Sequence, residues 1–336
     1  MLGRAWVSLG ALLVGLLGGY RLGARQSSSC STAAPVVAEC AARAAAAPAA
    51  TPTEAFALLT AELTPARLAR EASWRRRRAY RRAAPFPHAI FDDLIPRRVV
   101  DLLAEEIPEQ TDEGGECAIR HSTGSPCFRE RGVQFRKTAL DSEADMGPAT
   151  RQVFAFLRSS PFIHFLENLT SVHGIVPDPH YRGSGVHMTA PGGLLGVHAD
   201  FNRYPKYGLR RRVNTFIFLN PDWPQAYGGE LELWSRNMSR CEQRIAPIHG
   251  RVVVFSSTDF SYHGHPQPLA APPGRMRRSL ALYYFSKGCP TDECLESDCE
   301  KPHTTLWQAP KGCVRCQEAT CRAYPDEETD RGQTAG

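Results

Sequence analysis

The first regular pattern in the chain is helical. Over Pro96–Ile107 apolar residues recur three or four positions apart, at Val99, Val100, Leu103 and Ile107. This spacing brings side chains to one face of an α-helix. The same period runs through Met146–Leu169. We therefore expect helices in both ranges.

After Tyr181 the pattern changes to short apolar runs separated by Gly, Pro and Asp clusters, which is typical of strands joined by turns. The runs are Val213–Leu219, Glu230–Trp234, Arg251–Phe255 and Ser279–Phe285. An earlier run, Pro85–Phe91, predicts an opening strand. Helices followed by many strands predict an α+β, mainly β fold. The helices should pack on one side of a sheet sandwich or barrel.

The N-terminus indicates the secretory route. Ala5–Tyr20 is uncharged and mostly apolar, with Arg4 before it and Arg21 after it. A spanning helix needs roughly 17–25 residues, and a signal-peptide core roughly 7–15. We expect residues 1–24 to be a signal anchor, or alternatively a cleaved signal peptide. The chain would then be a single-pass type II membrane protein facing the endoplasmic reticulum or Golgi lumen, or else secreted. The glycosylation sequons at Asn168 and Asn237 fit this address.

Residues 25–84 are predicted to be a stem and connector. The part up to residue 66 is rich in Ala, Pro, Ser and Thr and is typical of a flexible stem. Its Cys30 and Cys40 are candidates for a disulfide to a partner or to a second copy of the chain. Eight arginines then fall within residues 67–82. This run fits a solvated, part-helical connector, or a contact for an acidic partner or a membrane surface.

The net charge argues against a nucleic-acid-binding protein. It is +5 over the whole chain, and the arginine run accounts for it. The remainder is near neutral, which is not typical of a domain that binds nucleic acid through a broad basic surface.

The cysteines predict an oxidising compartment or a metal cluster. Six of the 11 lie between Cys289 and Cys321, in a C-terminal tail that we place at residues 288–336. We expect disulfides there; zinc bound through Cys313 and Cys316, or free thiols, are the alternatives. Cys117 and Cys127 could close a loop, and Cys241 is the candidate unpaired thiol if the other cysteines pair locally.

The candidate chemistry centres on two histidines and an aspartate. In a strand, His198 and Asp200 would point to the same face, although a surface histidine and a turn aspartate fit that spacing equally well. His263 follows a later apolar strand and would complete a set of two histidines and one carboxylate, with His265 as its competitor. Such a set binds Fe(II) on one side and leaves positions open on the other.

A carboxylate pocket is predicted beside these residues. Arg277 opens the next apolar strand, and strand alternation places Ser279, Ala281 and Tyr283 on the same face as Arg277. An arginine fork with a neighbouring hydroxyl would suit the distant carboxylate of a keto acid.

The sequence around these residues resembles the Fe(II)/2-oxoglutarate dioxygenases of the prolyl 4-hydroxylase type. The matching motifs occur in family order between residues 85 and 287, which we take as the catalytic domain. They are Pro-Phe-Pro-His-Ala-Ile-Phe-Asp-Asp at 85–93, Gly192–Asp200, Arg212–Trp223, Tyr227–Trp234, Gly250–Phe255, Tyr262–His263 and Arg277–Tyr284.

The resemblance implies a double-stranded β-helix, or jelly-roll, with packed N-terminal helices. It implies iron ligation by His198, Asp200 and His263, and keto-acid binding by Arg277. The family's cofactors would be Fe(II), 2-oxoglutarate, O₂ and L-ascorbate. Because Asp200 is present, hydroxylation is favoured over the halogenation that relatives lacking this ligand perform.

The implied substrate is peptidyl proline in secretory-pathway proteins. Lysine, another side chain or a small molecule are the alternatives with the same chemistry. A non-catalytic jelly-roll binding module and a membrane-tethered scaffold are the alternatives without it. The chain departs from the family at Phe218, where relatives carry a tyrosine that binds the keto acid. His187 and Thr189 share a strand face and are candidates to supply the missing hydrogen bond.

Overall fold

The computed structural model describes residues 54–107, 128–130, 133–288, 290, 293–294 and 301–308. These residues fall within one unit of the chain, from Ala50 to Gly336. The expected N-terminal signal, the stem cysteines, the Cys117–Cys127 loop and most of the cysteine-rich tail lie outside the described residues. Within the described ranges, no helix combines the length and the apolar character needed to cross a bilayer.

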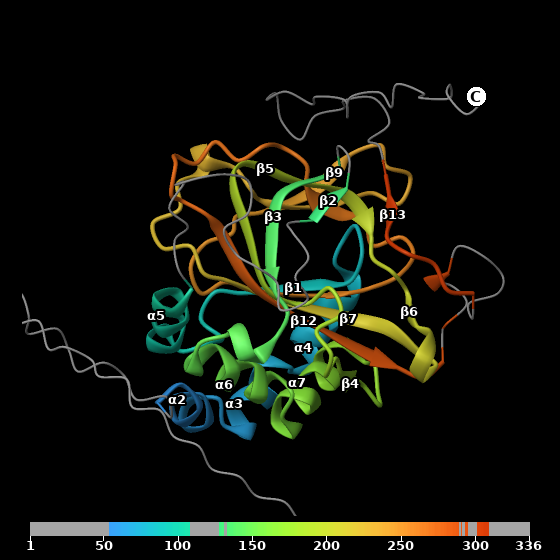
Figure 1. Cartoon of the computed structure of the whole chain (residues 1–336). Coiled ribbons are helices and arrows are strands. Elements are labelled where there is room, and N and C mark those ends of the chain that lie inside the picture. Colours follow the sequence, from blue (N-terminus) through green and yellow to red (C-terminus); the bar gives the residue numbers. More distant parts are fainter. Residues whose placement is uncertain are drawn as a thin grey trace, which may run out of the picture. The chain divides into compact units, whose positions relative to one another are not determined.

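Helices gather on one side of the sheet (Figure 1). Their apolar side chains share one buried cluster with side chains from the sheet, among them Val186, Ile217 and Leu280. Removing this apolar surface from water is the main contribution to the stability of the arrangement. The helices are α2 (Glu54–Glu62), α3 (Pro65–Glu71), α4 (Trp74–Arg82), α5 (Arg97–Glu106), α6 (Pro148–Leu157) and α7 (Ser160–Thr170), with 3-10 turns at Glu143–Asp145, Pro205–Tyr207 and Gln225–Tyr227.

The strands form one antiparallel, curved sheet whose hydrogen-bonded path runs β1-β10-β7-β12-β5-β11-β8-β9. This arrangement confirms the predicted α+β, mainly β jelly-roll class. The strands of the path are β1 (His88–Phe91), β5 (Gly185–Ala199), β7 (Leu209–Phe218), β8 (Leu231–Trp234), β9 (Cys241–Ile245), β10 (Val252–Ser256), β11 (His263–His265) and β12 (Arg277–Ser286). Joined to it are β2 (Phe128–Glu130), β3 (Gln134–Leu140), β4 (Val176–Pro177), β6 (Arg203–Tyr204) and β13 (Leu306–Trp307).

The long strand β5 connects the two parts of the sheet that carry the candidate site. Its first residues pair with β12 and β3, and its last residues pair with β11 and β13. The close approach of β11 depends on Gly264, because a Cβ there would lie 2.6 Å from the Gly196 carbonyl oxygen. Residues distant in sequence are thereby held along one strand.

Two helical expectations met different outcomes. The helix predicted over Pro96–Ile107 is confirmed as α5. The pattern over Met146–Leu169 is divided into α6 and α7, because the backbone is extended at Ser159 and Pro161 lies in the first turn of α7. Proline has no amide hydrogen and is tolerated in a first turn but not in a helix interior.

Residues 54–66 differ from the expected flexible stem, whereas the part-helical connector expected over residues 67–82 is present in α3 and α4, with the arginines of α4 exposed. Ala55 and Leu59 of α2, Leu68 of α3 and Tyr80 of α4 belong to the buried cluster. The Tyr80 hydroxyl also lies 2.9 Å from the Ser256 hydroxyl on β10. A few apolar residues at helical spacing are therefore enough to dock a segment whose overall composition is small and polar.

The expectation of an unpaired Cys241 is wrong. Cys241 and Cys294 are both disulfide-bonded. That expectation assumed that the other cysteines pair with close neighbours in the sequence, which would have left Cys241, at the start of β9, without a partner.

Candidate metal centre and anion pocket

His198, Asp200 and His263 meet where β5 ends and β11 begins. His198 and His263 are directly opposite each other in the antiparallel register. The Asp200 carboxylate lies 3.6 Å from His198 Nε2 through Oδ1 and 3.5 Å from His263 Nε2 through Oδ2. One ligand atom from each residue lies within 4.8 Å of the others, and all three residues are buried.

Backbone carbonyls fix the orientation of both imidazoles. His198 Nδ1 lies 2.8 Å from the Gly196 carbonyl oxygen, and His263 Nδ1 lies 2.8 Å from the Ser261 carbonyl oxygen. A carbonyl oxygen only accepts, so each Nδ1 carries a hydrogen, and Nε2 is in each case the nitrogen that faces Asp200. Burial lowers the pKa of His263 to about 4, so this imidazole is neutral near pH 7, as a metal ligand must be.

Asp200 is held as a carboxylate by two polar neighbours. Its Oδ2 accepts a hydrogen bond from Asn214 Nδ2 at 2.8 Å and lies 2.9 Å from Arg211 Nη2. Burial by itself would raise the pKa of Asp200, but the charge of the Arg211 guanidinium, the largest opposing influence, holds it well below its usual range. With Oδ2 engaged, Oδ1 is the oxygen better placed to bind a metal. Two neutral imidazoles and one ionised carboxylate are the donors that suit Fe(II).

The triad opens into a cavity of about 180 Å³. Strands from both parts of the sheet contribute to its wall, so the metal-binding side chains and the predicted carboxylate pocket share one space. Its lining comprises Gln134, Lys137, Gly183, His187, Leu195, His198, Asp200, Phe201, Arg211, Phe216, Phe218, Leu231, His263, His265, Arg277, Ser279, Tyr283, Thr305 and Trp307.

Arg277 presents a buried positive charge to this cavity. Its Nε donates to the Gly229 carbonyl oxygen at 2.6 Å, and its guanidinium carbon lies 5.0 Å from the centre of the Phe218 ring. In the described part of the chain, no carboxylate forms an ion pair with it. Burial lowers the pKa of Arg277 to about 10, so it remains cationic near neutral pH. The charge of Glu230 opposes this lowering without an ion pair, and an anionic ligand bound directly to Arg277 would reduce the remaining cost of burying the cation.

The strand register brings most of the predicted keto-acid residues together. Ser279 on β12 is opposite Phe218 on β7 and opposite His187 on β5. Ser279 and His187 both line the cavity, and His187 Nε2 lies 3.1 Å from the Gly183 carbonyl oxygen. Thr189 is opposite Arg277 but is buried outside the cavity lining. The structure therefore places His187, and not Thr189, beside the space where a keto acid would bind.

The cavity also contains residues that the sequence did not indicate. Lys137 on β3 is opposite Thr189, and Trp307 on β13 is opposite His198. No local pattern marks either residue, because each is brought in by a pairing between distant segments. His265 lines the same cavity but lies outside the triad.

The part of the chain that carries this geometry matches a known family. Residues 184–285 match the model of the 2OG-Fe(II) oxygenase superfamily. No curated protein matches the chain. Among solved structures, the chain is similar to a Pseudomonas putida prolyl-4-hydroxylase, with 17% identity, 63% of this chain and 100% of that chain covered, and a TM-score of 0.40.

Two further solved structures are similar at the same level. One is a Trichoplax adhaerens prolyl hydroxylase in complex with a hypoxia inducible factor oxygen degradation domain peptide fragment. It has 16% identity, with 59% of this chain and 83% of that chain covered, and a TM-score of 0.37. The other is a structure of prolyl 4-hydroxylase from Phytophthora capsici, with 17% identity, 66% of this chain and 64% of that chain covered, and a TM-score of 0.39. The triad, the cavity and the match over residues 184–285 identify this part of the chain as a domain of the 2OG-Fe(II) oxygenase superfamily.

Proposed function

We propose that this chain uses Fe(II), 2-oxoglutarate and O₂ to hydroxylate prolyl residues of proteins or peptides, with succinate and CO₂ as co-products. One observation carries the proposal. A triad of two imidazoles and an ionised carboxylate shares a cavity of about 180 Å³ with a buried arginine that forms no ion pair among the described residues. The proline substrate is taken from the motif resemblance over residues 85–287.

The roles of the metal-binding residues follow from their donor atoms. His198 Nε2, His263 Nε2 and Asp200 Oδ1 would hold the ion. Bound there, Fe(II) supplies the oxidative chemistry with O₂ in which 2-oxoglutarate is converted to succinate and CO₂. Arg211 and Asn214 keep the Asp200 carboxylate ionised and oriented.

The residues at the other end of the cavity would bind the cosubstrate. Arg277 and Ser279 suit the distant carboxylate of 2-oxoglutarate through an ion pair and a hydroxyl hydrogen bond. His187 is the candidate replacement for the tyrosine that relatives carry at the position of Phe218. The apolar surfaces of Phe216, Phe218 and Leu231 would exclude water from the reacting groups.

The test is turnover by the full chain, expressed in a secretory host. It would be incubated with Fe(II), 2-oxoglutarate, and proline- and lysine-containing peptides, with and without ascorbate. We expect succinate together with peptides heavier by one oxygen on proline, and neither product from His263→Ala. Oxygen on lysine would replace the proline assignment. Absence of succinate from the folded, iron-loaded protein would overturn the proposed function.

We also propose that the chain acts in the lumen of the secretory pathway. The apolar segment Ala5–Tyr20 supports this, as does the position of Asn237, which is exposed in the turn between β8 and β9. Thr170 of the other sequon is buried and donates to the Leu166 carbonyl oxygen, so Asn237 is the better acceptor. We expect the protein from secretory cells to lose mass on glycosidase treatment, and we expect Asn168→Gln but not Asn237→Gln to keep this loss. Absence of any glycan on the protein from secretory cells would contradict the luminal location.

A further inference from the structure

The segment from residue 301 to 308 lies along the metal-binding end of the cavity. Leu306 and Trp307 form β13, which pairs antiparallel with the end of β5, with Trp307 opposite His198. The Gln308 amide donates to the Val197 carbonyl oxygen at 2.8 Å. The end of β5 therefore has β11 on one side and this segment on the other.

The side chains of the segment alternate between the cavity and the protein interior. Thr305 and Trp307 line the cavity. Leu306, between them, packs against the buried cluster around Val197 and Trp234. The Trp307 indole lies 4.9 Å from the His198 imidazole between ring centres, inclined by 47°. The segment thus adds an aromatic wall directly beside a metal-binding histidine.

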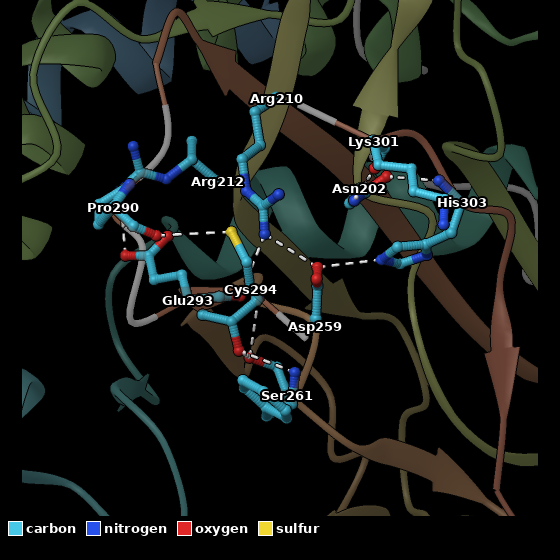
Figure 2. A network of polar contacts seen from close by, with 12 residues as sticks. Asn202, Arg210, Arg212, Asp259, Ser261, Pro290, Glu293, Cys294, Lys301 and His303 are labelled. Atoms are coloured by element: carbon cyan, nitrogen blue, oxygen red, sulfur yellow. Dashed lines mark hydrogen bonds and ion pairs between the residues drawn. The ribbon is translucent and has the colours of Figure 1, made fainter. Parts of the chain in front are cut away.

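A polar network fixes the segment to the jelly-roll (Figure 2). His303 Nε2 lies 3.0 Å from Asp259 Oδ1, the same oxygen that accepts from Arg210 at 2.9 Å. Asn202 Oδ1 accepts from the His303 amide at 2.9 Å, and Asn202 Nδ2 donates to the Lys301 carbonyl oxygen at 3.2 Å. The Asp259 side chain is only 4% exposed, so the ion pairs that it makes are shielded from solvent.

We propose that Trp307 is a specificity-determining residue of the oxygenase site, and that its indole is the surface on which the prolyl ring of the substrate packs beside the metal. This inference rests on the proposed function. An indole offers a large, rigid apolar face at low conformational cost, which suits an aliphatic ring. The contacts of the segment up to His303 hold the indole in place before any ligand binds, which reduces the entropy lost on substrate binding.

The experiment compares Trp307→Ala and Trp307→Phe with the wild-type full chain. Trp74→Ala is the matched control, because Trp74 is 61% exposed on α4 and lies outside the cavity lining. Three quantities are measured: Mn(II) affinity, 2-oxoglutarate affinity in the Mn(II)-loaded protein, and KM and kcat for a proline-containing peptide. The two affinities show whether each variant has folded with an intact metal and cosubstrate site.

We expect Trp307→Ala to retain both affinities and to raise the peptide KM by about tenfold. Trp307→Phe should fall between it and the wild type, because it keeps a smaller apolar face. Unchanged peptide kinetics in Trp307→Ala would overturn the proposal. So would a loss of Mn(II) affinity in both Trp307 variants, because the indole would then only support His198. A wild-type chain that makes succinate but modifies no proline would overturn the proposed function, and this inference with it.

Discussion

The two ends of the cavity carry their charges in different ways. At the metal end, the Asp200 carboxylate is balanced by Arg211 at 2.9 Å and by the amide of Asn214. At the other end, Arg277 donates only to the backbone oxygen of Gly229 among the described residues, none of which forms an ion pair with it, and Glu230 acts on it only through its charge. Both ends are buried, so neither charge is screened well by water.

This difference separates what the fold provides from what a ligand must bring. The metal end is preorganised, because each histidine is oriented by a carbonyl and the aspartate is held ionised before any metal binds. At the other end, Arg277 gains a direct ion-pair partner only when an anionic ligand binds. We therefore expect the loss of a metal ligand to abolish the whole site, and changes around Arg277 to affect the cosubstrate alone.

The largest expected effect is that of removing a metal-binding imidazole. His263→Ala should lose stoichiometric metal and lower the turnover of 2-oxoglutarate by about 10³-fold or more. His265→Ala is the matched control, because His265 is buried in the same strand and lines the same cavity. Metal content by elemental analysis distinguishes the two variants. Loss of metal in His265→Ala with retention in His263→Ala would reverse the assignment.

Arg277→Gln should weaken 2-oxoglutarate binding without weakening metal binding. Removing one partner of a buried charge pair costs about 2–5 kcal/mol, so the affinity for 2-oxoglutarate should fall by about 30-fold or more while metal affinity is kept. Titration of 2-oxoglutarate into the Mn(II)-loaded protein measures this loss. Arg275→Gln, a nearby arginine outside the cavity lining, should behave as the wild type. Equal 2-oxoglutarate affinity in Arg277→Gln would contradict the role of Arg277.

Arg211→Gln tests whether the positive charge beside the Asp200 carboxylate supports metal binding. Changes in groups that orient a metal ligand typically cost about 10–100-fold in metal affinity, and we expect a loss of that size. The 2-oxoglutarate affinity at saturating metal should change much less. Competition with a metal-indicator dye gives the metal affinity. A loss confined to 2-oxoglutarate binding would place Arg211 with the Arg277 end instead.

Ser279→Ala should have a smaller effect at the Arg277 end. One hydrogen bond to a charged group contributes about 1.5–3 kcal/mol, and the remaining ion pair to Arg277 should keep the loss of 2-oxoglutarate affinity near the lower limit, about tenfold. The same titration measures it. A double variant, Ser279→Ala with Arg277→Gln, should lose less than the sum of the two single effects if both residues bind one carboxylate.

The smallest expected effect concerns pH. Burial lowers the pKa of His263 to about 4 and that of Arg277 to about 10, so neither of these two groups changes charge near pH 7. His303 differs: burial opposes its protonation, but Asp259 raises its pKa above the usual value. A raised pKa in the folded state adds stability that is complete below the unfolded pKa, about 6.5, and is lost as pH rises through the folded value.

His303→Gln should therefore lower the melting temperature more at about pH 5.5 than at about pH 8.5, where the wild-type imidazole is neutral. Because the His303 side chain is 20% exposed, the difference should stay within about 1 kcal/mol. Thermal unfolding of both proteins at the two pH values measures it. An equal difference at both pH values would show that the Asp259–His303 pair does not depend on protonation.

Local patterns predicted the parts of the site whose residues are close together in the sequence. The alternation of Arg277, Ser279 and Tyr283 is seen in the cavity lining, and the two-residue spacing of His198 and Asp200 brings both to the same centre. The period over Pro96–Ile107 also produced the expected helix. In these cases the geometry of a single helix or strand decides where the side chains lie.

The remaining features depend on contacts between distant segments. Trp307 reaches His198 through a strand pairing across more than a hundred residues, and Lys137 enters the cavity through the register of β3 on β5. Residues 54–62 pack as helix α2 although the composition of residues 25–66 suggested a flexible stem. Register and docking are set by the whole fold, so the hydrophobic pattern of the segment itself does not specify them.

The most direct test of the two-ended site is equilibrium dialysis of the full chain with Mn(II) and labelled 2-oxoglutarate. The wild type should bind one metal ion and one 2-oxoglutarate, His263→Ala should bind neither, and Arg277→Gln should keep the metal and lose 2-oxoglutarate at concentrations that saturate the wild type. Full 2-oxoglutarate binding by Arg277→Gln, or full metal binding by His263→Ala, would contradict the account.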